Sequence, residues 1–166
     1  MSARSRNVID YLHGVRRYDR AVKRNRAEID RLKEHLMDVK ESVRALQAVS
    51  YDGIGVQTSK TNRTEDRIIK AVDAEREICS RIAELEQRNA DMDASRIAII
   101  DQINMLGGDP YYSDILFHVY VEQKDLQYVA DQIDKSYYYC CHKHGEALMK
   151  FADKYLGGTS IATNSK

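Results

Sequence analysis

Four side chains able to bind metal or move protons stand close together near the end of the chain: Cys140, Cys141, His142 and His144. Thiolate and imidazole groups are ligands that zinc prefers. Successive residues of a helix point about 100° apart, so only Cys140 and His144 share a face. No second pair of ligands stands nearby. We therefore expect neither a metal nor a cofactor, and we place Cys140 and His144 in a helical core.

Catalytic motifs are also missing. The chain has no Gly-x-Ser-x-Gly elbow, no His-Glu-x-x-His helix and no glycine-rich loop ending in Gly-Lys-Ser/Thr. The carboxylates of Asp91 and Asp93 lie on a polar helix face that solvent is expected to cover. The sequence predicts that the protein is not an enzyme.

The cysteines and histidines belong to a pattern of short helices. Apolar residues at helical spacing predict a helix over 125–133, a turn over 134–136, and a longer helix that Ser136 caps. A short helix, a tight turn and a longer helix are typical of a helix-turn-helix. A further helix over about 110–122 completes a three-helix module at 107–156. The glycine-rich residues 157–166 are expected to form a disordered tail.

A recognition helix of this kind lies in the major groove of DNA. We expect Tyr137, Tyr138, Cys141, His142 and Lys143 to lie nearest the bases, and Lys135 and Lys150 to contact phosphate. The complete predicted set is Lys135, Ser136, Tyr137, Tyr138, Cys141, His142, Lys143 and Lys150. It contains no arginine, the residue that most often reads guanine, so we expect a weak module that relies on a partner.

Two long stretches carry the strongest periodic signal. Steps of three and four residues along 8–46 and along 68–106 each follow one mainly apolar stripe, the seam of a coiled coil. If the second stretch folds back antiparallel on the first, facing seam residues have numbers that sum to 114. Asn25 then faces Asn89, and such a buried pair fixes the register. We predict a helical hairpin over 1–106.

The segment between the two stretches alternates apolar and polar residues around Asp52-Gly53, which predicts a β-like tip at 49–64. Outside the seam, the first stretch has a solvent-facing basic stripe, which could contact nucleic acid or simply be solvated. The stripe consists of Arg16, Arg17, Arg20, Lys23 and Arg24. Cys79 lies beside the second seam, and we expect it to be packed.

Composition limits the class of protein. The 166 residues include 26 basic and 26 acidic side chains, but the zero net charge conceals a net +6 over residues 1–26. No apolar stretch approaches 20 residues, so we expect no membrane span. We expect neither a secretory signal nor a disulfide framework, which favours the cytoplasm.

The stretches Tyr128-Val-Ala-Asp-Gln-Ile-Asp-Lys-Ser136 and His144-Gly-Glu-Ala-Leu148 resemble the fourth region of bacterial sigma factors. More narrowly, residues 8–152 resemble a phage and prophage family of sigma-like regulators of the ArpU and RinA types. The resemblance implies DNA binding and control of transcription. We expect double-stranded DNA of the bacterial host as the partner, and RNA polymerase as a further partner of a weakly binding module. The chain departs from the family in its arginine-poor recognition helix.

These observations predict an all-α protein, in which a long antiparallel coiled-coil hairpin precedes a helix-turn-helix module. The leading hypothesis is a DNA-binding transcription regulator of phage type. Two alternatives stay open: a DNA-packaging protein like a small terminase subunit, which would form a large ring, and a coiled-coil adaptor that binds only protein. Homo-oligomers fit all three.

Overall fold

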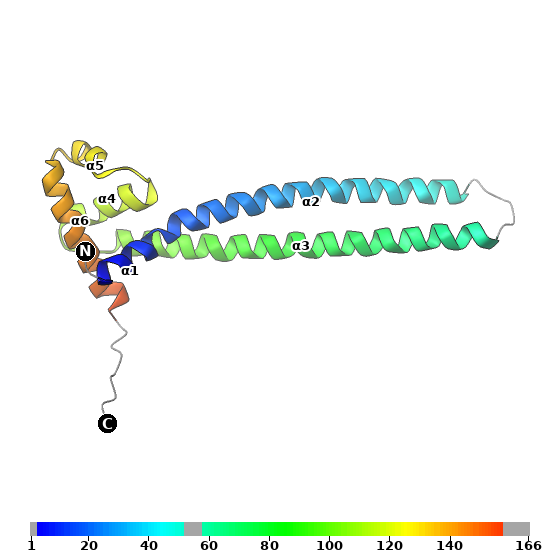
Figure 1. Ribbon diagram of the computed structural model, residues 1–166, viewed down its shortest axis with the longest axis horizontal. Helices are drawn as coiled ribbons and strands as arrows, with labels where there is room; N and C mark the ends of the chain where they lie inside the picture. The colour runs from blue at the N-terminus through cyan, green and yellow to red at the C-terminus, as the bar shows by residue number, and fades with distance from the viewer. Residues whose placement is uncertain (1–2, 52–57, 158–166) are drawn as a thin grey trace, which may run out of the picture. The chain divides into compact units, whose positions relative to one another are not determined.

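The computed structural model describes residues 3–51 and 58–157, and in these ranges every regular element is helical (Figure 1). The prediction of an all-α protein is therefore confirmed. The elements are α1 (Ala3–Leu12), α2 (Gly14–Tyr51), α3 (Thr58–Asn104), α4 (Pro110–Leu116), the π-helical η1 (Phe117–Val121), α5 (Leu126–Gln132), α6 (Tyr137–Phe151) and the π-helical η2 (Ala152–Leu156). No helix in the described ranges combines the length and apolarity that crossing a membrane requires.

The described residues pack into two compact units. One combines residues 3–20 with 92–157, and the other contains residues 21–91. The boundary predicted near residue 107 is therefore not where the packing divides. The ends of the long helices carry large apolar residues, and these bury their surface against the C-terminal helices rather than only against each other.

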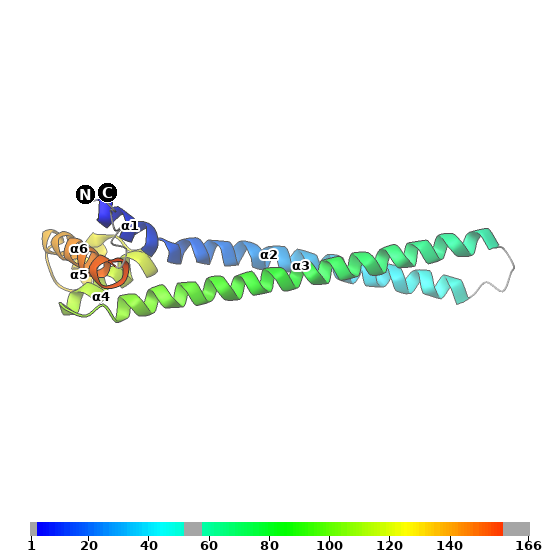
Figure 2. The ribbon, with the colours of Figure 1, turned by 90° about the horizontal axis from the view of Figure 1, so that it is seen from below.

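In the unit formed by residues 21–91, α2 and α3 run antiparallel beside each other (Figures 1 and 2). Its core is a narrow seam formed by Ile29, Ile78, Ile82 and Leu85, with Leu32, Leu36 and Val39 packed against it. Cys79 was expected to be packed, but it lies beside this seam and is exposed. At one point the seam is polar. Asn25 Nδ2 donates to Asn89 Oδ1 over 2.8 Å, and Asn89 is only 8% exposed. The residue numbers of this pair sum to 114, so it has the register expected for two facing seams.

The prediction of a β-like tip is wrong where the structure tests it. Residues 49–51 belong to α2 and residues 58–64 belong to α3, while residues 52–57 lie outside the described ranges. Extending an existing helix adds one hydrogen bond for each residue fixed. An isolated two-stranded hairpin is only marginally stable in water. Continuing the helices is therefore favoured over strand pairing.

In the unit of residues 3–20 and 92–157, the heptad pattern predicted one continuous first helix, but the structure divides it. The first part, α1, ends at Leu12, and α2 begins at Gly14. A Cβ atom at Gly14 would lie 3.2 Å from Ile99 Cδ1, so glycine permits a close approach at this break. On the N-terminal side of this break, Val8 and Leu12 of α1 are fully buried in a core that they share with Leu116 and Phe151.

The turn from α3 to α4 shows why the C-terminal helices begin where they do. Gly107 and Gly108 adopt φ of 67° and 97°, which glycine accepts without strain. Asp109 then caps α4, its side chain accepting from the Tyr111 amide over 3.0 Å, and Pro110 occupies the first helical position. The helix predicted over 110–122 continues as the π-helical η1. Of the predicted tail at 157–166, only Gly157 lies in the described ranges.

Candidate nucleic-acid interface

The segment α5–turn–α6 begins with a capped short helix. Asp125 caps α5, its carboxylate accepting from the Tyr128 amide over 2.7 Å. Val129 and Ala130 are buried on its inner face, where the small Ala130 side chain lets α6 pass close by. The helix ends at Gln132, close to the predicted boundary.

The turn between α5 and α6 is tight because one residue adopts a left-handed conformation. Asp134 has φ of 52°, which aspartate tolerates better than most side chains. The Lys135 amide donates to the Ala130 carbonyl over 3.0 Å, closing the end of α5. Ser136 then caps α6 by accepting from the Tyr139 amide over 3.2 Å. Together these bonds fix the direction in which α6 leaves the turn.

One face of α6 is built into the core of its unit. Cys140, Ala147, Leu148 and Phe151 are buried there. Burial, followed by the neighbouring Cys141, raises the pKa of the Cys140 thiol. In the described ranges, no three His, Cys, Asp or Glu side chains group as metal ligands would. Cys140 therefore serves as a packed core residue.

His144, on α6, contacts Tyr120 of η1 in a small polar cluster. Its Nε2 lies 3.1 Å from the Tyr120 hydroxyl, and the two rings stack with centroids 5.8 Å apart. The ring of His13 also contacts Tyr120, with centroids 5.3 Å apart and an edge-on geometry. Burial lowers the pKa of His144 and raises the pKa of Tyr120 to about 12. Both side chains are thus held neutral at pH 7, and the hydrogen bond between them pairs the Tyr120 hydroxyl with His144 Nε2.

The opposite face of α6 begins with two tyrosines in solvent. Tyr138 is 81% exposed and Tyr137 is 53% exposed, which is unusual for large aromatic side chains. Tyr137 and the half-buried Cys141 interact one helical turn apart, and this contact raises the pKa of Tyr137. Tyr139 instead turns inward and meets the edge of the Tyr111 ring at 6.1 Å. These contacts leave Tyr137 and Tyr138 as the aromatic surface of the helix start.

Lys143 was expected near the bases, but its ammonium group is paired with two carboxylates. Its Nζ lies 2.9 Å from Asp109 Oδ2 and 2.9 Å from Glu146 Oε2, and its side chain is 21% exposed. The Tyr112 hydroxyl also donates to Glu146 Oε2 over 2.9 Å. The Glu146 and Asp109 hydrogen bonds raise the pKa of Lys143, and hydrogen bonds from Lys143 lower the pKa of both carboxyls. Two carboxylates therefore neutralise this charge.

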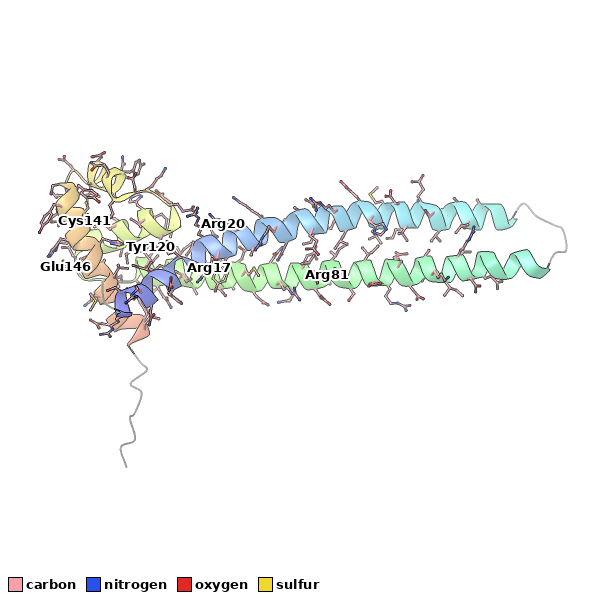
Figure 3. The ribbon with its side chains drawn as sticks, viewed as in Figure 1. Arg17, Arg20, Arg81, Tyr120, Cys141 and Glu146 are labelled. Atoms are coloured by element: carbon pink, nitrogen blue, oxygen red, sulfur yellow. The ribbon has the colours of Figure 1, made fainter. Side chains whose placement is uncertain are left out.

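The remaining predicted residues lie at the rim of α6. Lys135 is exposed, with Nζ 5.9 Å from the centre of the Tyr111 ring. His142 is exposed, and its Nδ1 lies 3.4 Å from Glu146 Oε1. Lys150 is exposed beside an open groove of about 800 Å³, whose lining includes Cys141 and Glu146, both labelled on α6 in Figure 3. Hence the turn offers Lys135 and α6 offers Lys150 and two tyrosines at the surface, but the segment has little net positive charge.

The predicted basic stripe is exposed on α2, which carries the labelled Arg17 and Arg20 (Figure 3). Arg16, Arg17 and Arg20 belong to the unit containing residues 92–157, whereas Lys23 and Arg24 belong to the unit of residues 21–91. Arg17 donates to the Asp10 carbonyl over 2.7 Å.

The sequence pattern missed Asp109 and Glu146 as partners of Lys143. Glu146 could have been found, because residues three apart on a helix are neighbours. Asp109 lies far away in the chain, and only the packing of α4 against α6 brings it to Lys143.

Comparison with known protein families, curated proteins and solved structures gives no match to this chain.

Proposed function

We propose that the protein is a DNA-binding transcription regulator of phage type, acting in the bacterial cytoplasm through α5 and α6 as a helix-turn-helix. One observation carries the proposal: α6 is anchored by its buried face while Tyr137 and Tyr138 stand in solvent at its first turn. A helix held in this way can place its N-terminal residues against base edges. Tyrosine can bond phosphates and pack on thymine methyl groups.

In this proposal the paired helices α2 and α3 form an antiparallel coiled-coil hairpin that serves as a contact for a second subunit or for RNA polymerase. The need for such help follows from charge. Residues 107–157 contain five basic and eight acidic side chains, and Lys143 is already neutralised. Neutralising phosphates with Lys and Arg supplies most of the sequence-independent affinity for DNA. A module with little free positive charge is therefore expected to bind weakly alone.

The test is selection of bound sequences from a random duplex library with the full chain, at about 50 mM salt. A selected duplex should bind at least about tenfold more tightly than a scrambled one. The Tyr137→Ala/Tyr138→Ala variant should lose this preference, whereas Met105→Ala, at an exposed site outside α5 and α6, should keep it. Equal retardation of every duplex, or of none, would contradict sequence-specific recognition.

A protein-only adaptor is the second candidate, and the pairing of Lys143 favours it. Asp134 lies in the turn before α6 and Asp125 acts electrostatically on Tyr137, so both carboxylates would repel phosphate near the start of α6. Genome-wide crosslinking of the tagged protein in its host separates the possibilities. Discrete promoter peaks support the regulator, peaks at packaging sites indicate a terminase-like role, and the absence of peaks supports the adaptor.

A further inference from the structure

The basic stripe of α2 contains the positive charge that α5 and α6 lack. All five of its side chains are exposed: Arg16, Arg17, Arg20, Lys23 and Arg24. Because α2 is one continuous helix from Gly14 to Tyr51, a rotation of about 100° per residue places the stripe on the side of the helix opposite the seam. The stripe therefore faces solvent, and the spacing within a single helix is enough to bring its members together.

Carboxylates do not neutralise the basic stripe. In the described ranges, none of its five cations forms an ion pair. The two acidic residues of α2 between positions 14 and 29 are paired with cations of α3 instead. Asp19 Oδ1 lies 2.9 Å from Arg96 Nε, and Glu28 Oε1 lies 3.1 Å from Arg81 Nη2. Arg17 Nη2 donates only to a neutral backbone carbonyl, so its charge also remains available.

The arrangement of the stripe does not stabilise its own helix. On a helix surface, opposite charges three or four residues apart attract each other, and like charges at these spacings repel. All four neighbours of Arg20 at these spacings are cations. The acidic residues that share this side of α2, which are Glu34, Asp38 and Glu41, lie farther along the helix. A helix face that is only solvated gains from mixing the two signs, so their separation favours a binding role for the stripe.

We propose that the basic stripe binds the phosphate backbone of duplex DNA independently of sequence. Four of its five residues are arginine, whose planar fork can bond one phosphate group through two N–H donors. The stripe covers about 12 Å of helix, and duplex DNA carries one negative charge per about 1.7 Å of its axis. A matching length of duplex therefore offers roughly seven phosphates to the five cations. The inference rests on the proposed DNA-binding function, but not on which bases α6 contacts.

The surroundings of the stripe favour DNA over a membrane or an acidic protein. Between positions 14 and 29, α2 exposes no large hydrophobic residue. A helix that lies on a membrane needs an apolar face to enter the lipid. The core of a protein interface is depleted of charged residues and enriched in aromatic ones. Binding through charge alone is instead typical of nucleic acid, where the release of counterions from phosphates supplies the free energy.

The test measures the Kd of the full chain for a fluorescent duplex of scrambled sequence, about 20 base pairs long, at salt concentrations from about 50 to 200 mM. Glutamine and arginine have similar helix propensities, so replacing one by the other removes charge and retains the helix. The variant Arg16→Gln/Arg20→Gln/Arg24→Gln should raise the Kd at least about tenfold at the lowest salt concentration. The slope of log K against log salt concentration should become shallower by about 2.7, because each lost phosphate contact removes about 0.9.

A matched variant separates the stripe from positive charge in general. Arg44→Gln/Lys70→Gln/Arg88→Gln also removes three exposed cations of α2 and α3, but all three lie outside the stripe. It should change the Kd less than about threefold. Circular dichroism checks that both variants remain helical. Equal weakening by the two variants, or no binding of the duplex by the unaltered chain at about 50 mM salt, would overturn the proposal.

Parallel measurements distinguish other partners and the role of α6. Polyglutamate that binds as tightly as the duplex, and is lost in the arginine variant, would assign the stripe to an acidic protein and overturn the proposal. Binding to vesicles of anionic phospholipid through the same arginines, without binding of the duplex, would overturn it in favour of a membrane. The Tyr137→Ala/Tyr138→Ala variant should keep the Kd for the scrambled duplex and lose only the preference for a selected one. Failure of base recognition by α6 is therefore distinguishable from failure of backbone binding by the stripe.

Discussion

Replacing both asparagines of the seam by leucine should stabilise the paired helices. In the double variant Asn25→Leu/Asn89→Leu, a hydrogen bond worth about 1 kcal/mol is lost. Burying a leucine contributes roughly 1.5–3 kcal/mol when the site is fully enclosed. Asn89 is nearly enclosed and Asn25 is half-buried. We therefore expect a leucine at position 89 to contribute about 2 kcal/mol and a leucine at position 25 to contribute about 1 kcal/mol. The net expected gain is about 2 kcal/mol.

The single variants should behave differently from the double variant. Asn25→Leu alone leaves the Asn89 amide buried without its partner, a cost of about 1–3 kcal/mol that cancels the packing gain. The two sites should therefore be coupled, so that the double variant is more stable than the sum of the single changes implies. Urea unfolding followed by far-ultraviolet circular dichroism measures all four members of this cycle.

A matched control separates packing from helix propensity. In a helix interior, leucine is favoured over asparagine by a few tenths of a kcal/mol. Asn7 is exposed in the middle of α1, so Asn7→Leu measures that contribution without a seam contact. A double variant that unfolds at a lower urea concentration than the unaltered chain would refute the expected gain, because the asparagines would then contribute more than the apolar contacts that replace them.

Three other predictions concern the C-terminal helices. Lys143→Met should lower the thermal midpoint of unfolding, because it removes the partner of Asp109. It should not change the slope of log K for DNA binding against log salt concentration. If Lys143 contacted a phosphate, the variant would instead reduce that slope by about one. His144→Gln should flatten the acid side of the stability profile. Because the pKa of His144 is lowered in the folded state, the unfolded chain binds the proton first as the pH falls below about 6.5, and stability drops there; an unchanged profile in urea titrations at several pH values would refute this. Ser136→Ala should cost about 1 kcal/mol by removing the cap of α6, and Ser136→Asp should restore it; equal urea midpoints for the unaltered chain and Ser136→Ala would contradict the capping role.

Local sequence predicted the helices well where an apolar period and a cap coincide. Asp109, Asp125 and Ser136 each precede a helical pattern, and each accepts a hydrogen bond from an amide of the helix that follows. Alternation alone was misleading at the tip, where the apolar and polar pattern was read as a strand. The residues on both sides of 52–57 are helical, because the helices that precede and follow them were already formed.

The sequence alone determined the properties that depend on neighbours in the chain: helical periodicity, helix caps, and the spacing that brings Asn25 opposite Asn89. Tertiary structure decided the properties that depend on residues far apart. Val8 and Leu12 join the core of the C-terminal helices, and Lys143 loses its free charge to Asp109. The physical reason is that burial and ion pairing depend on distance in space. Periodicity specifies which face of a helix is apolar, but not which surface will cover it.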